Sequence, residues 1–297
     1  MARFSAVVVT HNSRADLERL LASVERHLEP RPHLVVVDGG STDRTQALAR
    51  DRAELVRLPD NPGFGAASNA GVERAREEVT VLLNPDVELL DGALGTLADR
   101  ARGRRALLAP RLLNADGSVQ RSAHPPPGGL EALLPALLHP RLLPRPLRLR
   151  ADPWRSERPR SIGWAIAACL AAPTALLREL GPFDPRQFLF YEDMDLCLRA
   201  RAADAPTELH PDLALRHLGA HSTGPAFGGE PHDLLATRRR EVVAMRLGRR
   251  ALALDDAAQA LTFATRAGAR VLLRRDASRE REQLTALRHA RARRRAT

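Results

Sequence analysis

The stretch Val79–Leu90, which reads VTVLLNPDVELL, decides how the rest of the chain is interpreted. Its apolar-rich beginning, Val79–Leu83, is typical of a strand that is buried on both faces of a parallel sheet. Pro85 has no N–H to donate and ends the strand, so Asp86 lies at its carboxyl end. Open α/β sheets bind ligands at that end, and carboxylates bind Mg²⁺ or Mn²⁺ well. The stretch therefore indicates a diphosphate and metal site, with a turn-capping role for Asp86 as the alternative.

Two earlier strand ends also carry polar side chains. Phe4–Thr10 is a β-branched apolar run that predicts a central strand, and it delivers His11-Asn12-Ser13 to the carboxyl end. A helix with apolar residues at three- and four-residue spacing follows, and then Leu34–Val37 predicts a second strand that ends at Asp38 and two glycines. Glycine lets a backbone approach a ligand closely, so this β-α-β opening suits a nucleotide, and a well-capped turn is the alternative.

A stretch rich in small residues, Asn61–Gly71 (NPGFGAASNAG), predicts a helix that lies close to a neighbouring sheet or to a diphosphate. Tight helix packing explains its glycines equally well. The polar side chain of Asn69 is harder to explain by packing, and we therefore treat Asn69 as a candidate site residue.

An aromatic stretch followed by acidic residues lies further along the chain. Four of the ten aromatic residues fall between Phe183 and Tyr191. Three carboxylates then occur within four positions, at Glu192, Asp193 and Asp195. Like charges at this spacing are unfavourable unless a metal, another cation or a helix N-terminus compensates them. The pair Glu192 and Asp193 at a helix start is therefore a candidate acid/base site, and an acidic first helical turn is the alternative.

Composition sets the class of protein. With 297 residues, of which 44% are hydrophobic, the chain can bury the core of one large α/β domain and carry an appendage. The net charge is +10 and all 46 basic residues are arginine, which indicates a compositional bias. Aromatic residues make up 3%, so the stacking surfaces of single-strand nucleic-acid binders are missing. We therefore expect no nucleic acid as partner.

Cysteine usage and hydropathy predict where the protein works. The two cysteines suit a reducing compartment better than a disulfide scaffold. The longest uncharged run, Ser161–Leu177, is short for a membrane span and contains a glycine and a proline. We expect a cytoplasmic protein, with peripheral contact at the inner face of the plasma membrane as an option.

Two segments lie outside the strand and helix pattern of the rest. His124–Arg160 contains nine of the 22 prolines among leucines and arginines, and it predicts a flap within the main domain. Residues 230–297 predict a C-terminal extension of helices with basic faces. An apolar, arginine-rich segment suits a lipid-linked substrate or a membrane surface, whereas a solvated face and an inert insertion are the alternatives.

Six stretches together resemble the family 2 inverting glycosyltransferases, especially the bacterial rhamnosyl- and galactofuranosyltransferase-like branch of cell-surface polysaccharide assembly. They are VVVTHNS, VVVDGGSTD, NPGFGAASNAG, LLNPD, GPFDPRQFLFYEDMDLCLR and HLGAHS, in this order over residues 4–222. The resemblance implies an α/β protein of the GT-A fold, with a Rossmann-like, mostly parallel central sheet between helices. The main domain would then be residues 1–229. It also implies transfer of a sugar from a nucleoside diphosphate.

The resemblance assigns donor contacts to single residues. Thr10 and Asn12 match the loop that lies beside the base and ribose. Asp38 matches the carboxylate that contacts the pyrimidine, and Asn69 matches the amide of the glycine-rich helix that faces the donor.

The chemical groups are implied in the same way. Asp86 matches the last aspartate of the metal motif and His217 the histidine that completes the site for a divalent ion, Mg²⁺ or Mn²⁺. Asn84 stands where many relatives have a second aspartate, so the metal motif of this chain contains one carboxylate, that of Asp86. Asp193 matches the general base, and Glu192 is its rival for that role.

The leading hypothesis is metal-dependent, inverting transfer of a sugar, with dTDP-rhamnose as the first candidate donor. The acceptor would be a cell-surface glycan or a polyprenyl-diphosphate-linked sugar. One alternative is UDP-galactofuranose transfer. Another is a nucleotide-sugar-binding module without catalysis, which the intact acidic residues and His217 argue against.

Overall fold

The computed structural model describes residues 3–129, 132–138, 142–184, 189–219 and 230–293. The chain forms two compact units. The first comprises residues 1–123 and 156–226, and the second comprises residues 124–155 and 227–297. The main domain and its helical extension were predicted as consecutive segments, whereas here the proline-rich stretch groups with the C-terminal helices.

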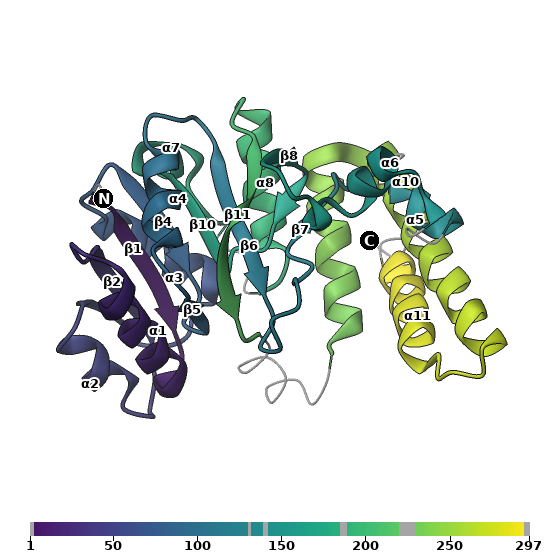
Figure 1. The fold of residues 1–297 in the computed structure, drawn as a ribbon. Coiled ribbons are helices and arrows are strands. Elements are labelled where there is room, and N and C mark those ends of the chain that lie inside the picture. The colour runs from purple at the N-terminus through teal and green to yellow at the C-terminus, as the bar shows by residue number, and fades with distance from the viewer. Residues whose placement is uncertain (1–2, 130–131, 139–141, 185–188, 220–229, 294–297) are drawn as a thin grey trace. The chain divides into compact units, whose positions relative to one another are not determined.

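A nine-stranded sheet organises the first unit (Figure 1). Its strand order is β3-β2-β1-β4-β10-β6-β11-β5, and β8 pairs with β11. The first four of these strands are all mutually parallel, and β10 joins antiparallel to both of its neighbours. The strands are β1 (Ser5–Thr10), β2 (His33–Gly39), β3 (Glu54–Leu58), β4 (Val79–Leu83), β5 (Val87–Leu89), β6 (Leu107–Leu113), β8 (Arg160–Ile162), β10 (Cys169–Pro173) and β11 (Thr207–His217). Two short strands, β7 (Ala123–His124) and β9 (Trp164–Ala165), form a separate pair.

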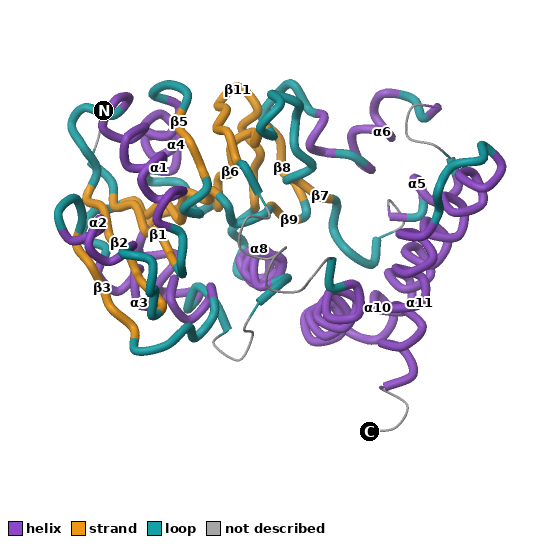
Figure 2. The backbone as a smooth tube through the Cα atoms, turned by 90° about the horizontal axis from the view of Figure 1, so that it is seen from below, coloured by secondary structure: helices purple, strands orange, loops and turns teal. Residues whose placement is uncertain are grey.

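Helices cover both faces of this sheet, so the predicted α/β class is confirmed. Figure 2 shows α1 and α4 on one side of the strands and α3 and α8 on the other. The helices of this unit are α1 (Arg14–His27), α2 (Thr45–Arg50), α3 (Phe64–Arg74), α4 (Ala93–Ala101), α7 (Thr174–Leu180) and α8 (Glu192–Ala202). Alternate strand residues therefore point to different helix layers, which explains why the central strands read as nearly continuous apolar runs.

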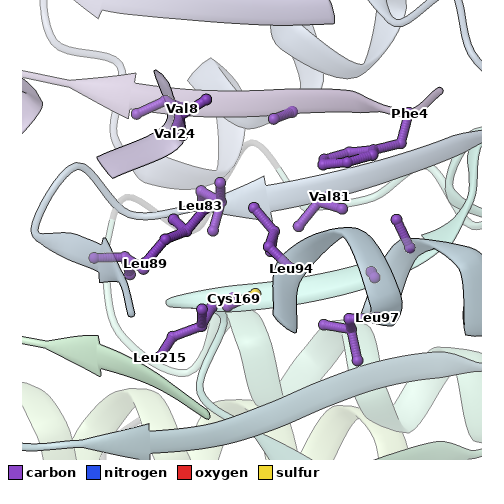
Figure 3. Packing of buried hydrophobic residues seen from close by; sticks show 14 of the residues in the cluster. Phe4, Val8, Val24, Val81, Leu83, Leu89, Leu94, Leu97, Cys169 and Leu215 are labelled. Carbon is purple, nitrogen blue, oxygen red and sulfur yellow. The ribbon is translucent and has the colours of Figure 1, made fainter. Parts of the chain in front are cut away.

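The larger core lies under α1 and α4 (Figure 3). Val8 of β1 and Val81 and Leu83 of β4 are fully or almost fully buried there. They pack with Leu94 and Leu97 of α4, which also have no exposed surface. This core fixes the carboxyl ends of β1 and β4, where the sequence placed its candidate site residues.

The opposite face of the sheet needs a glycine. A Cβ atom on Gly71 of α3 would lie 2.3 Å from Cγ1 of Val7 and 3.0 Å from Cγ2 of Val37. Helix α3 therefore approaches β1 and β2 more closely than any larger residue allows. Of the two explanations left open for the small residues of this helix, tight packing accounts for Gly71.

The second unit is helical. It contains α5 (Leu134–Leu137), α6 (Arg145–Ala151), a 3₁₀ turn at Pro153–Arg155, α10 (His232–Leu272) and α11 (Ser278–Arg293). Helix α10 bends at Gly248, whose φ is 81°. Within the described residues, no helix is at once long enough and apolar enough to cross a bilayer.

A close contact explains why the proline-rich stretch joins this unit. The N–H of Gly128 donates to Asp255 Oδ1 at 3.2 Å, and a Cβ atom on Gly128 would meet Ala251 at 2.7 to 2.8 Å. Arg239 in turn binds both oxygens of Asp255, at 2.7 and 2.8 Å. The hydrogen bond and the close approach of Gly128 hold the segment to α10, and the ion pair within α10 fixes the position of Asp255.

We expect Gly71→Ala to lower the free energy of unfolding by about 1–3 kcal/mol, because the added methyl group overpacks a filled interface. Urea denaturation followed by circular dichroism measures the change. Gly268→Ala is the matched control: Gly268 also lies in a helix, but nothing stands within 4 Å of its added Cβ. It should be neutral or stabilising by up to about 1 kcal/mol.

The contact between the added methyl group and Val7 can be tested by the same measurement. Val7→Ala removes the atom nearest the new methyl group, so the double variant should be more stable than the sum of the two single losses predicts. Equal stability of Gly71→Ala and wild type would contradict this account of α3.

Candidate active site

The first candidate loop follows β1 and is tied to the loop that follows β2. The Oδ1 atom of Asn12 accepts hydrogen bonds from the N–H and hydroxyl of Thr42, at 2.8 and 3.2 Å. The N–H of Asn12 donates to Ser41 Oγ at 2.8 Å, and His11 Nδ1 lies 2.7 Å from the carbonyl oxygen of Gly39. Asn12 itself has φ 50° and stays exposed. The predicted pair of adjacent loops is therefore present.

Asp38 holds these loops together from inside the protein. Its carboxylate has no exposed surface and accepts four hydrogen bonds. They come from the Thr10 hydroxyl at 3.1 Å, the Ser41 N–H at 2.9 Å, the Ser41 hydroxyl and Gln46 Nε2 at 2.7 Å. A nucleobase could bond to Asp38 only by replacing one of these donors. Contact of Thr10 and Asp38 with the donor stays a prediction that these contacts do not favour.

Asn69 lies on α3 and positions a distant loop. Its Nδ2 donates to the carbonyl oxygen of Phe183 at 2.8 Å, and its Oδ1 accepts from the N–H of Phe183 at 3.0 Å. The Phe183 ring also packs edge-on against Phe64, with ring centroids 5.4 Å apart. Asn69 thus fixes the loop that leads towards α8, and its contact with a donor remains a prediction.

Arg199 holds the other side of the same loop. Its guanidinium donates to the carbonyl oxygens of Leu180 and Pro182, at 2.5 and 2.7 Å. It also pairs with the buried Asp195 at 2.8 Å, one helical turn earlier. Of the three carboxylates in the acidic stretch, Asp195 is therefore a structural ion-pair partner.

Helix α8 begins from an unusual backbone. Phe190 and Tyr191, which precede Glu192, both have left-handed conformations, with φ of 73° and 63°. Such a conformation costs a residue with a side chain roughly 1–2 kcal/mol. Strain of this kind persists where the surrounding structure imposes it and is typical of functional sites. The Tyr191 ring packs against Trp164, with centroids 6.0 Å apart, which helps to hold the turn.

The two remaining carboxylates lie in the first turn of α8 and have abnormal acidities. Burial raises the pKa of Asp193 well above its usual range, although the N–H groups of Met194 and Ala167 bond to it and oppose the shift. Burial, and then the charge of Asp193, raise the pKa of Glu192 still further above the usual range. One oxygen of Glu192 is buried without a hydrogen-bond partner among the described residues. Glu192 is thus the group of the two that holds its proton more firmly.

Asp86 and His217 meet because β5 pairs antiparallel with β11. In that register His217 lies opposite Val87, and the Nε2 atom of His217 is 3.3 Å from Asp86 Oδ1. Burial alone would raise the pKa of Asp86, but the His217 ring and the N–H of Gly219, 3.0 Å from Oδ2, hold it below the usual range. Asn84 Nδ2 lies 3.5 Å from the same ring nitrogen. The two residues predicted to bind a metal therefore lie together, and metal binding by them stays a prediction.

Gln120 sets the orientation of the histidine ring and was missed by the sequence. Its Oε1 atom lies 2.9 Å from His217 Nδ1, and this contact holds the ring so that Nε2 faces Asp86. No residue pattern marks Gln120, which follows the turn Asp116-Gly117 in the sequence. The chain forms a hairpin around this turn, closed by the Leu113–Val119 bridge.

A two-residue backbone segment joins the two halves of the site. The N–H of Ala167 lies 3.4 Å from Asp193 Oδ2, and the carbonyl oxygen of Ala168 accepts from the N–H of Asn84 at 2.9 Å. Both alanines are buried. The base candidate and the metal motif are therefore held by consecutive residues, although about 110 positions separate them in the sequence.

Few of the described side chains are placed to hold a metal ion. Among the described residues, no group of three or more His, Cys, Asp and Glu side chains is arranged to hold a metal ion. His221, the second histidine of the HLGAHS stretch, lies outside the described residues. If a divalent ion binds here, Asp86 and His217 would be its protein ligands.

Comparison with solved structures identifies the fold. The mannosyltransferase PcManGT from Pyrobaculum calidifontis, solved with GDP-Man and Mn²⁺, has a TM-score of 0.62 at 17% identity, covering 98% of this chain and 87% of that chain. S. aureus TarS 1-349 in complex with UDP-GlcNAc has a TM-score of 0.55 at 15% identity, covering 98% and 80%. The predicted GT-A fold is confirmed by these glycosyltransferase neighbours.

Comparison of sequences identifies the family. The chain is 32% identical over 242 residues to the N-acetylglucosaminyl-diphospho-decaprenol L-rhamnosyltransferase of Mycobacterium tuberculosis, which covers 73% of this chain and 76% of that enzyme. It is 22% identical over 205 residues to the low-salt glycan biosynthesis hexosyltransferase Agl10 of Haloferax volcanii, covering 66% and 61%. Residues 5–176 match the model of glycosyl transferase family 2. The fold, the site and these matches agree, and the chain belongs to glycosyl transferase family 2.

Proposed function

We propose that the protein transfers a sugar, with inversion, from a nucleoside diphosphate to a hydroxyl group of a polyprenyl-diphosphate-linked acceptor. The observation that carries this proposal is the segment Ala167–Ala168, which holds the base candidate Asp193 beside the turn of Asp86. Single-displacement transfer requires a base and a site for the departing diphosphate close together. The mycobacterial rhamnosyltransferase named above supports a lipid-linked acceptor and dTDP-rhamnose as the first donor to test.

The donor set at Asp86 fits a divalent metal, Mg²⁺ or Mn²⁺. His217 Nε2 and Asp86 Oδ1 face each other at 3.3 Å, and an imidazole nitrogen and a carboxylate oxygen are both ligands found at divalent metal sites. A bound cation would neutralise the charge of the departing diphosphate. The mannosyltransferase PcManGT, which was solved in complex with Mn²⁺, supports the same choice.

Asp193 suits the general base because its raised pKa makes it a stronger proton acceptor than an ordinary aspartate while it stays ionised at neutral pH. It takes the proton of the acceptor hydroxyl as the hydroxyl oxygen bonds to the anomeric carbon. The bond from that carbon to the diphosphate oxygen breaks on the opposite face, which inverts the configuration. Glu192 does not suit this role, because its higher pKa keeps it protonated.

Transfer itself is tested with purified protein, dTDP-rhamnose and a synthetic N-acetylglucosaminyl-diphospho-prenol. We expect a product with inverted anomeric configuration, read by NMR. A panel of UDP-sugars, UDP-galactofuranose among them, tests the donor. Hydrolysis or transfer with retention would overturn the proposal.

We expect Asp193→Asn to lower kcat by roughly a hundred- to ten-thousandfold, because the variant keeps the shape of the side chain but cannot accept the proton. Affinity for the nucleotide sugar, measured by calorimetry, should not change. Glu192→Gln is the matched control and should retain far more activity, since a protonated acid and an amide are alike in charge. Similar losses in both variants would contradict the assignment of the base.

The pH dependence of kcat/KM should reflect the raised pKa of Asp193. The ionised carboxylate is the active form, so activity falls as pH decreases through this pKa. Because burial raises it, the acidic limb should lie well above the value of about 3.9 that is ordinary for aspartate. Initial rates in buffers of constant ionic strength measure the limb. A limb at the ordinary value would show that Asp193 is not the group that titrates.

We expect Gln120→Leu to weaken Mn²⁺ binding by about tenfold to a hundredfold, because it removes the hydrogen-bond partner that orients the His217 ring. Calorimetric titration of Mn²⁺ into the protein with bound nucleoside diphosphate measures the affinity. Gln46→Leu is the control, since Gln46 contacts Asp38 and not the metal pair. Full activity of the wild type in excess chelator would contradict metal dependence.

A further inference from the structure

The turn between α10 and α11 exposes consecutive aliphatic side chains. Val271, Leu272 and Leu273 have exposed fractions of 52%, 84% and 63%. They lie at the end of a helical hairpin, where the chain reverses from α10 into α11 (Figure 1). A connection between two helices normally carries polar residues, because exposed aliphatic surface is unfavourable in water. A surface of this kind indicates contact with an apolar partner.

The next two residues add positive charge. Arg274 and Arg275 are exposed, and their side chains form no ion pair with any residue that the structure describes. Arg270, by contrast, is paired with Glu280 at 2.8 Å. Residues 266–281 contain six arginines but two acidic residues. The tip therefore joins exposed aliphatic side chains to a local excess of positive charge.

The turn itself is well fixed. The N–H of Leu273 donates to the carbonyl oxygen of Ala269 at 3.0 Å, and that of Arg275 to Arg270 at 2.8 Å. Asp276 begins α11 by accepting from the N–H and hydroxyl of Ser278, at 3.0 and 2.7 Å. The exposed side chains are thus presented by an ordered backbone and lose little additional entropy on binding.

We infer that the segment Val271–Arg275, here called the tip, inserts into an anionic phospholipid bilayer. The aliphatic side chains would enter the boundary between headgroups and acyl chains, and the two exposed guanidinium groups would bind lipid phosphates. The inference rests on the proposed function, since a polyprenyl-linked acceptor resides in a bilayer. A second copy of the chain is a poorer occupant, because tip-to-tip pairing would bring four exposed arginines together.

The test is cosedimentation of the full chain with vesicles. Wild type should bind vesicles of equal parts phosphatidylglycerol and phosphatidylcholine, bind phosphatidylcholine alone weakly, and dissociate as salt is raised. Leu272→Ser and the pair Arg274→Gln with Arg275→Gln should each weaken binding to the anionic vesicles by about tenfold. Inorganic phosphate at equal ionic strength should not release the protein, which separates a bilayer from a free phosphate.

Leu254→Ser is the matched control. Leu254 is an exposed leucine of the same helix, at 39%, and it lies outside the tip. Its binding should equal that of wild type. Wild type that fails to bind, or a dimer in light scattering that Leu272→Ser dissociates, would overturn the inference.

A second readout separates this inference from the proposed function. Sugar transfer to a short-chain, water-soluble acceptor without vesicles should be the same for wild type and Leu272→Ser. Loss of vesicle binding with transfer intact confirms the role of the tip alone. Vesicle binding without any transfer would leave the tip in place and refute the proposed function.

Discussion

The antiparallel pairing of β5 with β11 is the contact on which the candidate active site depends. It is three residues long, yet it sets His217 opposite Val87 and so brings its ring to Asp86. The ring orientation is then fixed by Gln120 from a neighbouring hairpin. A shift of one residue would turn each side chain to the other face of the sheet. The register of one short strand therefore decides whether Asp86 and His217 lie together.

Burial is the second constraint on the site. Asp193 and Glu192 lie in a first helical turn, whose N–H groups favour negative charge, but desolvation outweighs that effect and raises both pKa values. The protein holds these buried groups in place by a strained turn at Phe190 and Tyr191 and by the loop clamped by Arg199. Stability is thus reduced locally to obtain a basic carboxylate.

Features of the site that depend on neighbouring residues could be predicted from the sequence, whereas contacts between distant residues could not. The strand Val79–Leu83, its end at Pro85 and the helix start at Glu192 depend on neighbouring residues, and the structure confirms them. The structural task of Asn69 was not foreseen, because its partner Phe183 lies 114 positions away. Asp38 was correctly placed at a strand end, but spacing could not reveal that four donors already surround it.

The sequence by itself determined the fold class and the positions of Asp86 and Asp193 at the ends of their elements, since periodicity and strand-end chemistry are local properties of the chain. It determined the family through six short stretches that resemble the known one. Only the tertiary structure decided that Ala167–Ala168 bonds both to Asp193 and to Asn84, and that the proline-rich stretch packs with the C-terminal helices. Both contacts use backbone groups or a glycine, which carry no side-chain signature. Pairings of that kind follow from sheet order and from burial, and so they appear only once the whole chain has folded.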